Sequence, residues 1–81
     1  MTAPQPATPV DDTYWYEHRR ELEPGQIFRL ADGSIVMLDK TVPGDGTKWY
    51  VVDRFNGHWS YEGSTIEPGE LRSMPLDGVP K

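Results

Sequence analysis

The stretch Lys48–Tyr61, KWYVVDRFNGHWSY, decides the fold of this chain. It holds two of the three Trp residues, two of the four Tyr and one of the two Phe. Near its middle stands Asn56-Gly57, the strongest short-range hairpin signal, because a type I′ turn needs positive φ at both central residues. The sequence therefore predicts an aromatic β-hairpin at the centre of a small β domain.

The turn fixes a register for this hairpin. Phe55 then faces His58, Arg54 faces Trp59, Asp53 faces Ser60 and Val52 faces Tyr61. Opposed residues share a face of the sheet. One face carries Tyr50, Val52, Arg54, Trp59 and Tyr61, and the other carries Trp49, Val51, Asp53, Phe55, His58 and Ser60. We assign the Val52/Tyr61 face to the interior. A slip of one residue inverts this assignment and leaves Arg54, Trp59 and Tyr61 as the exposed patch.

Length and composition limit what the chain can be. Its 81 residues make one domain with a small core, and the absence of Cys excludes disulfides and thiolate metal sites. A net charge of −5 argues against nucleic-acid binding, which requires a basic surface. There is neither a membrane-spanning apolar run nor a signal-peptide pattern. We therefore expect a protein that is not secreted, is cytoplasmic or virion-associated, and binds other proteins.

The first 23 residues divide into an arm and a docking segment. Residues 1–10, MTAPQPATPV, are rich in Pro and predict a flexible arm. Pro6 and Pro9 form a PxxP pattern, which aromatic grooves can bind. Asp11–Glu23 is the one plausible helix, with Asp11 or Asp12 as N-cap. A strand through Thr13–Glu17 is the alternative, because its aromatic residues favour β structure.

That helix would carry an apolar stripe. Tyr14, His18 and Leu22 recur at helical spacing, and Trp15 lies beside them. We expect the stripe to dock on the β domain.

Residues 24–74 are predicted to hold five strands. A second type I′ hairpin is expected at Asp32-Gly33, with Leu30 facing Ile35, Phe28 facing Met37 and Ile27 facing Leu38. Loops are expected at residues 43–47 and 62–65, a last strand at Leu71–Met74 and a tail at residues 75–81. Pro24-Gly25 and Pro68-Gly69 both suit type II turns, so each is expected to lead into a strand, with the first and last strands side by side.

The order of these elements resembles a Src-homology-3-like small β-barrel over about Glu23–Met74. The resemblance implies a mainly β, five-stranded barrel with an N-terminal helix or arm. Nothing matches the acidic-aromatic segment with which the signalling members bind polyproline, and the relatives that bind ribosomal RNA are basic. Tudor-like relatives hold methylated side chains in an aromatic cage, for which Trp49, Tyr50, Trp59 and Tyr61 would supply the walls.

No catalytic or cofactor pattern is present. His18 and His58 are the two histidines, without metal-ligand spacing, and no nucleophile motif or phosphate loop occurs. We expect no enzyme, no cofactor, no small-molecule substrate, and a protein partner or homo-oligomer. The candidate binding residues are Trp49, Arg54, Phe55, His58, Trp59, Pro6 and Pro9.

The predicted function is a structural or accessory module of a larger assembly, similar to the decoration proteins of bacteriophage particles. The alternatives are a small acidic inhibitor that occupies a basic site, as nucleic-acid mimics do, and an aromatic-cage peptide reader.

Overall fold

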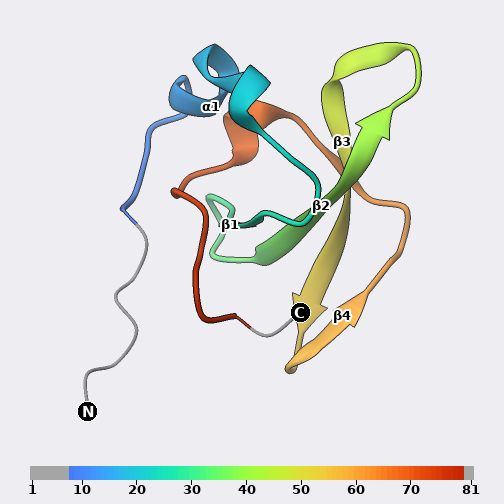
Figure 1. The fold of residues 1–81 in the computed structure, drawn as a ribbon. Helices are drawn as coiled ribbons and strands as arrows, with labels where there is room; N and C mark the ends of the chain where they lie inside the picture. The colour runs from blue at the N-terminus through green and yellow to red at the C-terminus, as the bar shows by residue number, and fades with distance from the viewer. Residues whose placement is uncertain (1–7, 80–81) are drawn as a thin grey trace.

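A computed structural model describes residues 8–79 and shows a mainly β protein (Figure 1). Five strands form one antiparallel sheet in the order β1-β2-β3-β4, and β5 pairs with β3 on the same edge as β4. The strands are β1 (Ile27–Arg29), β2 (Ile35–Val42), β3 (Asp45–Phe55), β4 (His58–Ser60) and β5 (Thr65–Ile66). Within this part of the chain, strand pairing does not close the sheet into a barrel.

The β3–β4 turn is the predicted type I′ turn. Asn56 has φ 52° and Gly57 has φ 79°, and Asn56 is the one non-glycine residue with positive φ among residues 8–79. The pairs Phe55–His58, Arg54–Trp59 and Asp53–Ser60 match the predicted register. The predicted pair Val52–Tyr61 does not form, because β4 ends at Ser60.

The β1–β2 turn differs from the prediction. Gly33 has φ 90° but Asp32 does not have positive φ, and the N–H of Gly33 donates to the carbonyl of Leu30 at 3.0 Å. The connection is therefore a three-residue loop with a left-handed glycine. It is closed by a hydrogen bond that the N–H of Leu30 donates to the carbonyl of Ser34 at 2.8 Å. The register therefore moves by one residue. Phe28 lies opposite Val36 and Ile27 opposite Met37.

The β2–β3 connection is shorter than predicted. Val42 pairs with Asp45, so Pro43-Gly44 alone forms the turn, with Gly44 at φ 81° as a type II turn requires. Asp45–Thr47, predicted as loop, belongs to β3. The register between β2 and β3 shifts after Leu38 and again after Thr41, so the long hairpin is interrupted by bulges.

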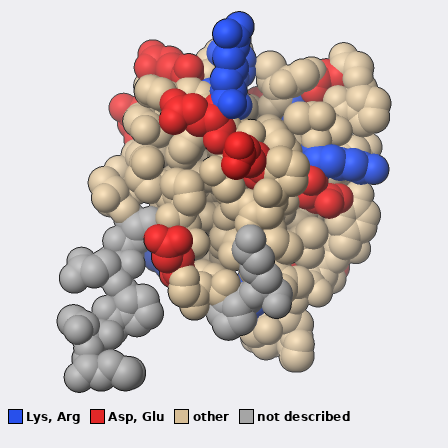
Figure 2. Space-filling model, in the orientation of Figure 1, with Lys and Arg blue, Asp and Glu red and all other residues tan. Residues whose placement is uncertain are grey.

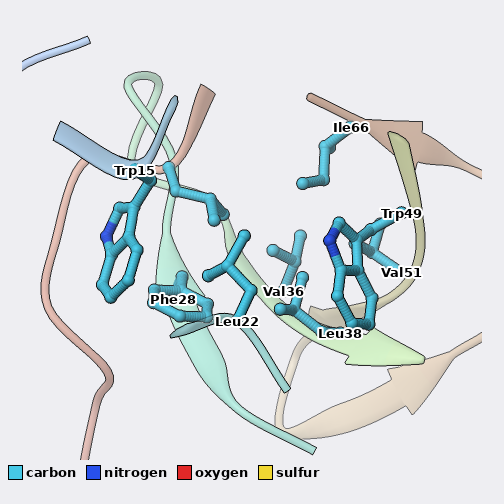
Figure 3. Packing of buried hydrophobic residues seen from close by; sticks show 9 residues of the cluster. Trp15, Leu22, Phe28, Val36, Leu38, Trp49, Val51 and Ile66 are labelled. Atoms are coloured by element: carbon cyan, nitrogen blue, oxygen red, sulfur yellow. The ribbon is translucent and has the colours of Figure 1, made fainter. Parts of the chain in front are cut away.

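The core lies on the face of the sheet opposite to the one we assigned. Trp49 and Val51 are buried, with 7% and 0% of their surface exposed, whereas Tyr61 is 55% exposed. Our face assignment is therefore wrong and its inverse holds. In Figure 3, Trp15 and Trp49 stand at opposite ends of the cluster, with Phe28, Leu22, Val36 and Leu38 between them. Phe55 and His58 belong to the same face by register, yet they remain exposed because the hairpin extends beyond the core.

Asp11–Glu23 is helical, not a strand, but its helix is short. α1 (Tyr14–Glu17) is followed by the 3-10 turn η1 (Arg19–Glu21). Asp11 Oδ1 accepts hydrogen bonds from the N–H groups of Thr13 and Tyr14, both at 3.0 Å. Trp15 and Leu22 enter the core, while Tyr14 and His18 stack on each other at 4.2 Å between ring centroids. Tyr14 is partly buried and packs against the core as well, so the predicted stripe docks through three of its four members.

Trp15 also ties the helix to the far end of the chain. Its indole N–H donates to the carbonyl of Ser73 at 2.8 Å, and the Ser73 hydroxyl accepts the N–H of Arg29 at 2.9 Å. An ideal Cβ at Gly69 would lie 3.0 Å from the carbonyl oxygen of Asp12. Gly69 does not have positive φ, so Pro68-Gly69 does not form the predicted type II turn. It lies in the 3-10 turn η2 (Pro68–Glu70), where glycine allows the helical segment to approach closely.

The segment after η2 runs beside β1, as the paired Pro-Gly turns suggested. The N–H of Arg72 donates to the carbonyl of Arg29 at 2.9 Å, and that of Leu76 to the carbonyl of Ile27 at 2.7 Å. The predicted last strand at Leu71–Met74 is reduced to isolated bridges, Leu30–Leu71 and Pro9–Ser73. The fifth strand is instead β5, in a region predicted as loop and turn.

Candidate functional site at the β3–β4 tip

The β3–β4 tip, defined as residues 53–62, is where the chain exposes large side chains and a groove. It projects at one end of the sheet, away from α1 and from the β2–β3 turn (Figure 1). Phe55 is 73% exposed and Tyr61 is 55% exposed. One other large apolar side chain of residues 8–79 is similarly exposed, Tyr16 at 54%, and it belongs to α1.

On the outer face of the tip, opposite the core, Arg54 and Trp59 form a pair. They are cross-strand partners, both half-buried, and the Arg54 guanidinium lies 5.1 Å from the centroid of the Trp59 ring. Farther along the same face, the Lys40 ammonium lies 5.7 Å from the centroid of the Tyr50 ring. Such cation–π contacts stabilise by about 0.5–1 kcal/mol at exposed sites.

The tip also contains a groove of about 410 Å³, lined by residues from both faces of the sheet. Three segments of the chain line this groove: the start of β2 with the residue before it, the end of β3, and the end of β4 with the residues that follow it. The lining residues are Ser34, Ile35, Asp53, Arg54, Phe55, Ser60 and Glu62. The neighbouring β1–β2 turn is itself fixed, because Asp32 Oδ1 accepts the N–H of Ser34 at 2.9 Å. That hydrogen bond holds the pKa of the Asp32 carboxyl below its ordinary value of 3.8.

The structure brings four of the predicted binding residues together at the tip: Arg54, Phe55, His58 and Trp59. Trp49 lies in the core and is 7% exposed. Pro9 is exposed and bridges to Ser73 at the opposite edge of the sheet, beyond β1. Pro6 lies outside the described residues.

The four aromatic residues suggested for a cage are not brought together. Trp49 lies on the core face opposite Ile66, whereas Trp59 lies on the outer face opposite Arg54. Tyr50 pairs with Lys40 on the outer face, nearer the β2–β3 turn.

Sequence reasoning missed the groove itself. Ser34 and Ile35 reach it because Ile35 pairs with Arg54, and this pairing depends on the shifted β1–β2 turn and on the β2–β3 register. Glu62 follows the tip, and we predicted it only as loop. One feature of the sequence points to a surface site here. An aromatic and an acidic residue, Tyr61-Glu62, directly follow the short strand after the Asn-Gly turn.

On the face seen in Figure 2, the charged side chains do not form a single patch. Asp and Glu side chains are spread over it, several of them close together at upper left, and Lys and Arg side chains stand among them. Residues 8–79 contain no group of three or more His, Cys, Asp and Glu side chains placed to hold a metal ion. None of the helices in that range is long and apolar enough to cross a membrane.

Comparisons with protein-family models, with curated proteins and with solved structures gave no match.

Proposed function

We propose that this chain is a non-enzymatic protein-interaction module that serves as a structural or accessory component of a larger assembly. The β3–β4 tip is its binding surface. The proposal includes the architecture of a Src-homology-3-like small barrel, which the pairing of the segment after η2 with β1 supports.

One observation carries the proposal. Among residues 8–79, two of the three exposed large apolar side chains, Phe55 and Tyr61, belong to the same hairpin tip, beside the half-buried pair Arg54–Trp59. Aromatic residues and Arg dominate the energetics of protein interfaces. The aromatic side chains bury a large area and lose little conformational entropy. A ring that is 73% exposed gains little from burial in the fold, and its grouping with Tyr61 at one tip supports an interface.

The test compares the tip with a matched surface elsewhere. Tyr61→Ser and Phe55→Ser remove the tip side chains, and Tyr16→Ser removes an equally exposed ring from α1. Each tagged variant is used as bait, and recovered proteins are quantified by mass spectrometry; sedimentation velocity over a concentration series measures self-association. We expect the tip variants to lose a partner or an oligomer that the parent and Tyr16→Ser both keep. Equal recovery and equal sedimentation for all four chains would contradict the proposal.

The kind of assembly stays a prediction. The bacteriophage particle was suggested by the acidic small barrel with Pro-rich arms, and the acidic-inhibitor alternative by the net charge of −5. The identity of a recovered partner separates them, because an inhibitor is expected to bring down a protein with a basic site, and a particle component its neighbours in the shell.

A further inference from the structure

The β3–β4 turn carries the one Asn residue of the chain, Asn56, directly before a glycine. Asn56 and Gly57 are both exposed, and an added Cβ at Gly57 would meet no atom within 4 Å. The closing pair of the hairpin is Phe55–His58, so the ladder hydrogen bonds belong to those two residues. Between the described residues, no hydrogen bond holds the Asn56 side chain, and no backbone carbonyl accepts the Gly57 N–H. Neither group is therefore held away from the other.

From this turn we propose that Asn56 is a modification site, at which the Gly57 nitrogen displaces the side-chain amide. The Gly57 N–H gives its proton to hydroxide, and its nitrogen bonds to Asn56 Cγ. The Cγ–N bond of the side-chain amide breaks, and that nitrogen leaves with a proton from water as ammonia. The product is a five-membered succinimide ring. The reaction suits this dipeptide because glycine has no Cβ to obstruct the approach of its nitrogen.

Water then opens the ring in one of two ways. Attack at Cγ breaks the bond between Cγ and the Gly57 nitrogen and gives Asp. Attack at the carbonyl carbon of residue 56 breaks the other C–N bond of the ring and gives isoaspartate, in which the main chain runs through Cβ and Cγ. Overall, water is consumed and ammonia is released, without oxidation or reduction. Both products add a negative charge to the tip, and isoaspartate also lengthens the backbone of the turn.

Two of the Asp-Gly dipeptides of the chain provide a structural comparison. Asp32 Oδ1 accepts the N–H of Ser34 at 2.9 Å. Asp45 Oδ1 accepts the N–H of Thr47 at 3.1 Å and its hydroxyl at 2.8 Å. These hydrogen bonds hold both side chains toward the second residue along the chain. Asp is also ionised at neutral pH, and a carboxylate is a poorer electrophile than an amide. Asn56 has neither disadvantage, so we expect the reaction at position 56 and not at Asp32 or Asp45.

The test incubates the full 81-residue chain at neutral and at mildly alkaline pH, below its melting temperature. Proteolysis then releases the peptide that contains residue 56, and chromatography with mass spectrometry compares it with synthetic standards that carry Asn, Asp or isoaspartate. We expect both products to accumulate in the folded chain. They should form faster at the higher pH, because the attacking nitrogen must lose its proton. A synthetic peptide of residues 53–60, too short to fold stably, is the positive control.

Asn56→Gly is the matched control variant, because Gly-Gly also suits a type I′ turn and carries no amide. In this variant the release of ammonia and the shift to more acidic species in ion exchange should be lost, apart from any background from Gln5 and Gln26. Conversion of the peptide without conversion of the folded chain would overturn the inference. So would Asp without isoaspartate, because direct hydrolysis gives Asp alone, or isoaspartate at Asp32 or Asp45 as fast as at position 56. These outcomes involve no partner protein, so they are independent of the proposed function.

Discussion

Gly57 and Gly46 allow the cost of a left-handed backbone to be separated from the cost of a larger side chain. Gly57 has φ 79°, whereas Gly46 lies in β3 without positive φ, and neither has an atom within 4 Å of an added Cβ. A β-branched residue at positive φ is strained by about 1–3 kcal/mol. We therefore expect Gly57→Val to lower the free energy of unfolding by that amount and Gly46→Val to change it little. Urea unfolding of both variants measures the difference, and equal stability would show that the turn tolerates another conformation.

Asp11 is a residue whose ionisation matters to the helix. Hydrogen bonds from the side chain and the backbone N–H of Thr13 lower the pKa of its carboxyl from 3.8. Because the pKa is lower in the folded chain than in the unfolded chain, the stabilisation is complete above 3.8 and is lost as the pH falls through the folded value. Asp11→Ala should therefore flatten the dependence of stability on pH below about pH 4, measured by urea unfolding at several pH values. If stability depended on pH in the same way in Asp11→Ala and in the parent, the ionisation of Asp11 would not contribute to the stability of the fold.

At the scale of elements, one buried hydrogen bond contributes to the docking of α1 beside the packing of Trp15 in the core. Trp15→Phe removes the indole N–H that reaches the Ser73 carbonyl at 2.8 Å and keeps an aromatic ring near Phe28. A buried acceptor left without its donor costs about 1–3 kcal/mol, so the variant should unfold at lower urea concentration. The control is Tyr16→Phe, at the next position in the chain, where the side chain is 54% exposed. It should unfold at the same urea concentration as the parent. If both variants were equally stable, this hydrogen bond would be irrelevant to docking.

The elements also show why the sequence predicted the register of the β3–β4 hairpin correctly and that of the β1–β2 hairpin one residue away from the observed register. Asn56 accepts φ 52°, so Asn56-Gly57 closed a two-residue turn and its register followed. Asp32-Gly33 fits a two-residue and a three-residue turn equally well, because Gly33 is left-handed in both. The structure adopts the longer one, which puts Val36 instead of Met37 opposite Phe28. The choice depends on packing across the sheet, because that register buries Phe28, Val36 and Leu38 together.

The same reasoning limits what could be predicted of the site. Local patterns identified the tip residues Arg54, Phe55, His58 and Trp59, because all four lie within one hairpin. The burial of Trp49 and the groove depend on contacts between distant segments. Both sides of the hairpin are aromatic, so composition alone did not indicate which face meets the core.

At the scale of the whole molecule, the end of the predicted arm is bonded to the segment after η2. The N–H of Val10 donates to the carbonyl of Arg72 at 3.1 Å, and the carbonyl of Thr8 accepts the N–H of Met74 at 2.9 Å. Deleting residues 1–10 removes both hydrogen bonds and the packing of Val10 against the core, and should lower the melting temperature by roughly 5–10 °C. Deleting residues 1–7 keeps all of these contacts and should melt like the parent. A calorimetric scan that gives the same midpoint for both deletions would show that Thr8–Val10 does not stabilise the fold.

The distance along the chain between Trp15 and Ser73 has a consequence for how the protein is made. β1 to β4 follow one another through short turns and can pair as soon as each hairpin leaves the ribosome. The segments at Thr8–Val10 and around Trp15 are synthesised before all of these strands, yet their partners at residues 72–74 are synthesised after them. During translation, Thr8–Val10 and Trp15 therefore cannot make these contacts until residues 72–74 have been synthesised. Until then the Trp15 side of the core stays uncovered.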